Sequence, residues 1–125
     1  MNVVDSSGWL EYFSDGPRAV SFSPVVKDEA NLIVPTVCLY EVFKITLARV
    51  GEERALNVIG LMSFGQILDL DRKTALVAAQ FSVKYKLPMA DSIIYATAQG
   101  NDAVLWTLAE HFEGLPGVKF IKTKG

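Results

Sequence analysis

The 125 residues of this chain suffice for one independently folding domain, and half of them are apolar, so a sizeable core is expected. Twelve basic and fourteen acidic residues give a formal net charge of −2, which excludes broad electrostatic adhesion to nucleic acid and allows only a local basic groove. The single cysteine excludes an internal disulfide or a multi-cysteine zinc site, and the single histidine excludes catalysis by a histidine pair.

Apolar runs alternate with amphipathic segments along the chain, which favours alternating strands and helices. Asp15-Gly16-Pro17 breaks the pattern first, and Pro17 suits the first turn of a second helix. In chain order, the predicted elements are a strand at residues 2–5, helices at 6–13 and 17–31, a strand at 32–34, helices at 36–50 and 52–64, a strand at 67–70, helices at 72–86 and 90–99, and strands at 103–106 and 118–121.

Three of these helices carry apolar side chains at helical spacing, and the third helix is expected to turn such a face towards the core. The apolar positions are Trp9, Leu10 and Phe13 in the first helix, Leu39, Val42, Phe43 and Leu47 in the third, and Leu76, Ala79 and Val83 in the fifth.

Strands separated by helices predict an α/β fold with a mainly parallel sheet of four or five strands, because parallel neighbours need crossover connections. Helices should cover both faces of that sheet. In such folds, ligands gather outside the carboxyl ends of the strands. Functional side chains are therefore expected at that edge.

Three isolated carboxylates, Asp5, Glu41 and Asp91, lie where an apolar strand or helix gives way to its neighbour. A buried acid is costly unless a hydrogen bond or a cation compensates it. Asp5 follows the first strand, and the other two fall early in helices that follow connections at the same edge. If the fold gathers the three, they form an oxygen-rich pocket for a hard divalent cation.

Each acid also has a structural explanation. Asp5 and Asp91 stand near helix starts, where aspartate is a favoured N-cap residue. Glu41 interrupts an apolar run and could pair with Lys44 or Arg49. Both the structural and the functional interpretation are consistent with the sequence.

Other polar residues at element ends are open to two interpretations as well. Ser7 and Thr107 could satisfy backbone groups, and His111 fits an ordinary surface histidine. A catalytic triad would have to be built on His111 without the Gly-x-Ser-x-Gly turn that presents a serine. A receiver domain with Asp5 in its acidic pocket would need an adjacent pair of acids early in the chain, which is not evident.

The start of the chain has no basic region leading into an apolar segment, and no apolar run approaches the ~20 residues that cross a bilayer. One cytoplasmic domain spanning residues 1–125, without membrane contact, is therefore expected.

Three segments together carry a family resemblance: VVDSSGWLEYF at residues 3–13, PTVCLYEVFK at 35–44 and LPMADSIIYATA at 87–98. In this order and at these distances they resemble the PIN-domain family, and within it the small VapC-type ribonuclease toxins of VapBC toxin–antitoxin pairs. The likeness covers nearly the whole chain. It implies a three-layer α/β/α fold.

The resemblance also implies a function. Asp5, Glu41 and Asp91 would bind Mg²⁺ or Mn²⁺, and metal-activated water would hydrolyse phosphodiester bonds of single-stranded RNA. Thr107 would bond a ligand carboxylate, and Ser7 would support it. A cognate antitoxin protein is the implied partner.

The chain departs from the family pattern at one place. A further acid usually follows the threonine at the strand end by two residues, and Ala109 stands there. Either Glu110 or Glu113 substitutes from the next turn, or the site is weakened and activity reduced. The alternative function is a PIN-like RNA-binding or assembly module that has lost efficient catalysis.

The early helices carry more apolar and aromatic residues than one small sheet readily covers, so some should remain exposed. A large apolar patch usually marks an interaction surface, here for an antitoxin helix, a homodimer contact, or both. The residues concerned are Trp9, Tyr12, Phe13, Tyr40, Phe43 and Phe64.

Overall fold

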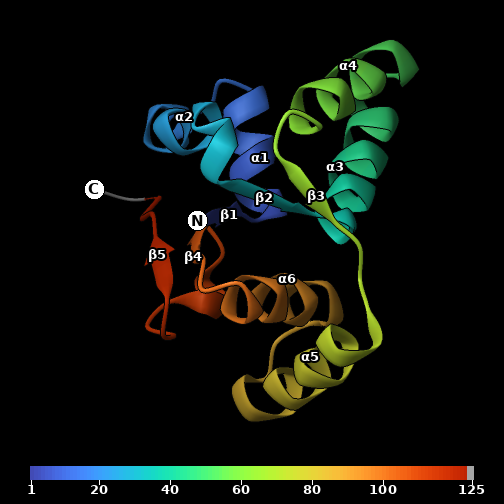
Figure 1. The fold of residues 1–125 in the computed structure, drawn as a ribbon. Coiled ribbons are helices and arrows are strands. Elements are labelled where there is room, and N and C mark those ends of the chain that lie inside the picture. Colours follow the sequence, from blue (N-terminus) through green and yellow to red (C-terminus); the bar gives the residue numbers. More distant parts are fainter. Residues whose placement is uncertain (124–125) are drawn as a thin grey trace.

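The computed structural model describes residues 1–123, and within them the sheet has five strands, all parallel, in the order β3-β2-β1-β4-β5 (Figure 1). This confirms the predicted α/β class and the parallel sheet. The strands are β1 (Asn2–Val4), β2 (Leu32–Pro35), β3 (Gln66–Leu68), β4 (Val104–Thr107) and β5 (Val118–Phe120).

Helices lie on both sides of the sheet, which makes three layers. In Figure 1, α1 and α2 lie above the strands and α6 below them, with α5 packed outside α6. The helices are α1 (Ser6–Phe13), α2 (Ala19–Lys27), α3 (Thr36–Arg49), α4 (Glu52–Met62), α5 (Arg72–Tyr85) and α6 (Met89–Gly100), with 3₁₀ turns η1 (Glu29–Asn31) and η2 (Glu110–Phe112).

The register of the central strands sets the position of the acidic edge. Val4 of β1 pairs with Trp106 of β4, so these two strands end side by side. The next backbone N–H, that of Asp5, donates to the carbonyl of Trp106 at 3.1 Å. The residue after β1 therefore lies beside Thr107, the last residue of β4.

The second helix is shorter than predicted. It begins at Ala19 rather than Pro17 and ends at Lys27, after which η1 forms a separate turn. The carboxylate of Glu11 accepts the backbone N–H of Arg18 at 2.7 Å, which holds the chain ahead of the helix in a turn. Pro17 belongs to that turn.

The apolar stripe predicted for α3 faces the core only in part: Val42 is buried and Leu39 packs against the core. In α3 the buried positions are Cys38, Val42 and Thr46, and Leu47 is 42% exposed. The face of the helix against the sheet is thus rotated by one residue from the predicted one.

In α5 the stripe of Leu76, Ala79 and Val83 is exposed. The helix packs instead through Phe81 and Tyr85, whose rings contact Tyr95 of α6 at centroid distances of 4.8 and 5.9 Å. These aromatic contacts hold that face of α5 against α6.

None of the helices in residues 1–123 combines the length and the apolar character that a membrane span requires.

Candidate functional site

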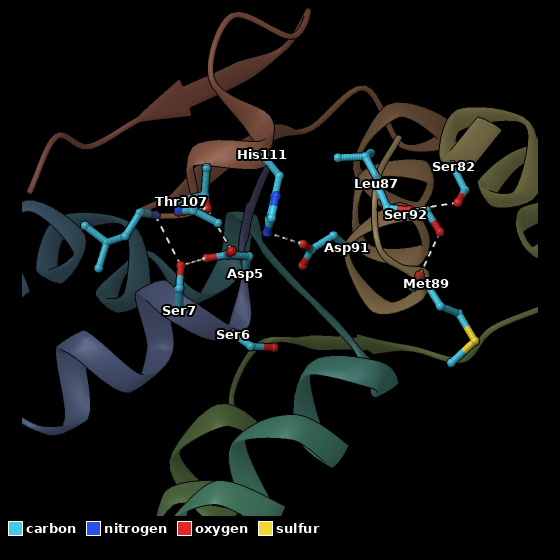
Figure 2. A network of polar contacts seen from close by, with 12 residues as sticks. Asp5, Ser6, Ser7, Ser82, Leu87, Met89, Asp91, Ser92, Thr107 and His111 are labelled. Carbon is cyan, nitrogen blue, oxygen red and sulfur yellow. Dashed lines mark hydrogen bonds and ion pairs between the residues drawn. The ribbon is translucent and has the colours of Figure 1, made fainter. Parts of the chain in front are cut away.

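Asp5 is the most enclosed acid of the site, with 2% of its surface exposed. Its Oδ1 accepts the Gly8 N–H at 3.0 Å and the Ser7 hydroxyl at 2.7 Å, and its Oδ2 accepts the Thr107 hydroxyl at 2.7 Å (Figure 2). Asp5 is thus the N-cap of α1, as the structural interpretation predicted. Capping does not exclude a second role, because an ionised carboxylate has about four acceptor sites.

Burial raises the pKa of Asp5 from 3.8 to about 6, against the opposing effect of hydrogen bonds from Ser7, Thr107 and Gly8. The negative charge of Asp91 raises it further. The ionised form is therefore costly inside the fold, and a cation beside Asp5 would relieve that cost.

Asp91 lies in the first turn of α6 and is partly buried. Burial raises its pKa, the charge of His111 lowers it, and the charge of Glu41 raises it. The N-cap of α6 is Pro88, without a side-chain hydrogen bond, so the capping explanation of Asp91 is wrong. Its carboxylate points instead towards His111 (Figure 2).

Glu41 lies in the middle of α3 and accepts a hydrogen bond from the Ser6 hydroxyl at 2.6 Å. The sequence suggested Lys44 or Arg49 as its partner, but within residues 1–123 neither forms an ion pair with Glu41. The packing of α1 against α3 brings Ser6 to it. Since Glu41 also acts on the pKa of Asp91, all three predicted acids lie at the same edge of the sheet.

Ser7 and Thr107 fasten the end of β4 to Asp5. The Ser7 hydroxyl oxygen accepts the Leu108 N–H at 3.2 Å, and the Thr107 hydroxyl oxygen accepts the Ala109 N–H at 2.8 Å. Both hydroxyls donate to Asp5 at the same time. They therefore satisfy backbone groups and orient the buried carboxylate at once.

Thr107→Val is expected to destabilise the fold at pH 8 by about 2 kcal/mol, because it removes a donor to a buried carboxylate and leaves the Ala109 N–H unpaired. Urea unfolding would measure the loss. Thr97→Val is the matched control, since the buried Thr97 hydroxyl only donates to the Ile93 carbonyl of its own helix, at 2.8 Å. Equal losses in the two variants would contradict a special role for the bond to Asp5.

The two candidate substitute acids after Thr107 line a hollow that does not include Asp5 or Asp91. Ala109 begins the η2 turn, and Glu110 and Glu113 are exposed in a shallow hollow with Lys122. His111 instead reaches the site, with its Nε2 3.8 Å from Oδ2 of Asp91 and its side chain 56% exposed. Treating it as an ordinary surface histidine missed this contact. In the sequence, the only indication of this contact was that His111 follows Thr107 by four residues.

The donors at this edge are suited to a hard cation, although they are not a preformed cage. Within residues 1–123, no three His, Cys, Asp or Glu side chains surround a common point as a ready-made metal site. Mg²⁺ commonly takes one or two carboxylates and keeps several waters. Asp5 and Asp91 supply two carboxylates at this edge, and burial raises the pKa of each, so a cation beside them would compensate their charge.

A hollow of about 350 Å³ adjoins the site between α1, α3 and α4. Ser7 is one of its lining residues, and Arg49 and Arg54 contribute positive charge to its wall beside the single acid Glu11. This is the kind of local basic groove that the near-neutral composition allows for a nucleic-acid ligand.

Residues 3–117 match the family model described as PIN domain. No curated protein matches the chain. A structure titled "Toxin-antitoxin complex from Klebsiella pneumoniae" has a TM-score of 0.78 and 24% identity, over 95% of this chain and 96% of that chain.

Two further structures share the fold at lower identity. "Crystal structure of DNA bound VapBC from Salmonella typhimurium" has a TM-score of 0.72 and 19% identity, over 97% of this chain and 98% of that one. "Crystal structure of Mycobacterium tuberculosis VapC20 (Rv2549c), Sarcin-Ricin loop cleaving toxin" has a TM-score of 0.71 and 13% identity, over 90% of this chain and 92% of that one. These similarities extend over almost the whole fold.

Proposed function

Because this chain belongs to the PIN domain family, we propose that it is a metal-dependent endoribonuclease and the toxin of a toxin–antitoxin pair. The observation that carries the proposal is the pair of acids Asp5 and Asp91. They lie at one edge of the sheet, and burial raises the pKa of both. Two of the similar structures support it, since one is a toxin–antitoxin complex and the other a toxin that cleaves the sarcin–ricin loop. The proposed unit is a single cytoplasmic domain over residues 1–125.

Asp5 and Asp91 would hold Mg²⁺ or Mn²⁺, which supplies a polarised phosphate oxygen and a water of lowered pKa. Ser7 and Thr107 keep the Asp5 carboxylate facing the site through their hydroxyl donors. Glu41, fixed by Ser6, would orient the attacking water or complete the metal's shell. The substrate would be single-stranded RNA.

Substrate binding would use the basic hollow beside Ser7. Arg49 is exposed there, and Arg54 donates to the Phe13 carbonyl at 3.3 Å while lying over the Phe13 ring. Guanidinium groups bind phosphate oxygens through paired hydrogen bonds. An RNA backbone entering this hollow would pass Ser7 on its way to Asp5.

Asp91→Asn should reduce cleavage of a single-stranded RNA by at least about 100-fold, because loss of a neighbour of a metal ligand already costs 10–100-fold. EDTA should stop the wild-type reaction, and added Mn²⁺ should restore it. Asp102→Asn is the control, since Asp102 is exposed at the opposite edge, before β4. Cleavage that persists in EDTA would reject the mechanism.

The alternative function, an RNA-binding or assembly module with weakened catalysis, is favoured by Ala109 alone. It predicts a wild-type chain that binds the RNA but does not cut it at any concentration of Mn²⁺. The same cleavage assay separates the two functions.

The antitoxin would bind the apolar surface around α1, α2 and α4. Leu61 and Phe64 are 52% and 66% exposed, and they line a hollow with Trp9 and Tyr12. The buried indole N–H of Trp9 has no acceptor within residues 1–123. An inserted helix would cover the exposed Leu61 and Phe64 side chains. A homodimer, alone or within the complex, could also cover exposed apolar side chains.

Phe64→Glu is expected to weaken binding of the protein encoded by a small adjacent reading frame by at least about tenfold, since it places a charge in an apolar contact. Isothermal titration calorimetry would measure this. Val83→Glu is the control, because Val83 is 83% exposed on α5, across the sheet from this surface. If both variants bind as the wild type does, the antitoxin sits elsewhere.

A further inference from the structure

The basic hollow between α1, α3 and α4 begins one side chain away from the acidic edge. Ser7 lines it, and the Ser7 hydroxyl donates to Oδ1 of Asp5 at 2.7 Å. Along α1 the hollow continues past Leu10 and Glu11, which share a helical face with Ser7. A strand bound in this hollow would therefore continue directly from the site at Asp5.

The wall formed by α3 runs in the same direction. Ile45 and Arg49 line the hollow and follow Glu41 at intervals of four residues, so the three side chains lie along one side of the helix. Glu41 accepts the Ser6 hydroxyl at the acidic edge. Arg49 lies about 12 Å further along the helix axis. The hollow thus leads from the carboxylates to a cation.

The inner wall of the hollow is apolar, with Leu10, Ile45 and the fully buried Val58 among its lining residues. Its volume of about 350 Å³ is in the range of sites that bind small organic ligands. A phosphodiester backbone is polar and would leave these apolar side chains uncovered. A planar ring would cover them.

Arg54 is held in place at the same hollow. Its Nη2 donates to the Phe13 carbonyl at 3.3 Å, and its guanidinium carbon lies 6.0 Å from the centroid of the Phe13 ring. The Phe13 ring stacks in turn on the buried Trp9 ring, with centroids 5.5 Å apart and 17° between the planes. The guanidinium is therefore pre-positioned, and nucleobases stack on guanidinium planes.

The charges favour a phosphate beside the apolar wall. Arg49 is exposed, and among residues 1–123 it forms no ion pair. Glu11, the acid of this hollow, already accepts a backbone N–H at 2.7 Å. Glu52 and Glu53 line a neighbouring hollow, where their charge would repel a phosphate. The binding stretch for a phosphate therefore lies between Ser7 and Arg49.

We propose that this hollow binds one nucleobase of the RNA strand, stacked on Arg54, while Arg49 binds an adjacent phosphate. The inference rests on the proposed function, because it names the part of the RNA that occupies the basic hollow. Phosphate contacts position a strand, whereas contacts to bases carry sequence preference. The chain would therefore select the base that lies near the cleaved bond.

Fluorescence anisotropy in EDTA tests this without any contribution from metal or cleavage. The probes are RNA hexanucleotides of adenosine, cytidine or uridine and an abasic hexamer of the same charge. We expect at least one base-containing hexamer to bind about tenfold more tightly than the abasic one. Arg54→Lys keeps the charge but removes the plane, so it should reduce this ratio to about threefold or less and leave the affinity for the abasic hexamer unchanged.

Arg49→Gln should behave differently, because it removes a phosphate contact. It should weaken binding of every hexamer by a similar factor, about three- to tenfold, and lower the slope of log K against log salt concentration by about 0.7. Arg72→Gln is the control for the lost charge, since Arg72 is exposed in the first turn of α5, across the sheet from the hollow. The replaced side chains are all exposed, so the variants should fold, and circular dichroism verifies this.

Equal binding of base-containing and abasic hexamers, or no binding of any hexamer, would overturn the base site, and metal-dependent cleavage by the same protein would leave the proposed function intact. Base-dependent binding without cleavage in Mn²⁺ would support the base site and reject the nuclease. If Arg54→Lys left RNA binding unchanged and weakened binding of the antitoxin, the hollow would belong to the protein partner and the base site would be wrong.

Discussion

Asp5→Asn is expected to abolish RNA cleavage and, in the same protein, to make the metal-free fold more stable at pH 8. Catalysis should fall by at least about 100-fold, because the substitution removes a ligand charge while keeping the side-chain volume. The gain in stability follows from the burial of Asp5, which raises its pKa from 3.8 to about 6. A residue placed for function is here costly to the fold.

The sign of the pH dependence follows from the raised pKa. The folded state holds the Asp5 proton more tightly than the unfolded state does, so Asp5 lowers stability wherever it must ionise. Below about pH 3.8 it is protonated in both states and costs nothing. The penalty grows as the pH rises to about 6 and then stays constant, with an upper limit of roughly 3 kcal/mol.

Urea unfolding in EDTA, at pH 4 and pH 8, would measure this penalty. Asp5→Asn should gain about 1–2 kcal/mol over the wild type at pH 8 and much less at pH 4, because asparagine offers the Ser7, Gly8 and Thr107 donors one acceptor oxygen instead of two. Asp102→Asn is the control, since Asp102 is exposed and has a φ of 51°, a conformation that asparagine tolerates. A variant less stable than the wild type at pH 8 would contradict the cost assigned to Asp5.

Much of the architecture could be predicted, because the spacing of apolar residues along the chain distinguishes strands from helices. The five strands and six main helices lie within a few residues of their predicted positions among residues 1–123. Asp5 could be singled out for the same reason, since it follows two buried valines and must be compensated on burial. Whether an acid directly follows a buried strand can be read from neighbouring residues in the sequence.

Contacts between distant elements could not be predicted in this way. The bond from Ser6 to Glu41 joins residues 35 positions apart and depends on how α1 crosses α3. The approach of His111 to Asp91 depends on the buried Phe112. Periodicity also left open which side of α5 faces its neighbour, because it identifies an apolar stripe but not the surface that the stripe meets.

Gly8→Ala is expected to destabilise the fold strongly, because α1 approaches the sheet at Gly8 more closely than a side chain allows. A Cβ built there would lie 2.7 Å from Cε1 of Phe22 and 2.7 Å from Cγ1 of Val4. Both neighbours are fully buried and cannot swing aside into solvent. Alanine would therefore push α1 away from β1, although in an open helical position it would stabilise by about 1 kcal/mol.

Overpacking of this kind typically costs 1–3 kcal/mol, so the melting temperature of Gly8→Ala should fall by about 5–10 °C. Gly60→Ala is the matched control, since a Cβ at Gly60 in α4 meets nothing within 4 Å, and this variant should be slightly more stable than the wild type. The Gly8 N–H donates to Oδ1 of Asp5, so the displaced helix should also weaken Mn²⁺ binding in Gly8→Ala and not in Gly60→Ala. Equal melting temperatures for the two variants would mean that α1 can shift freely, and the close approach at Gly8 would then not be what holds Asp5 in the site.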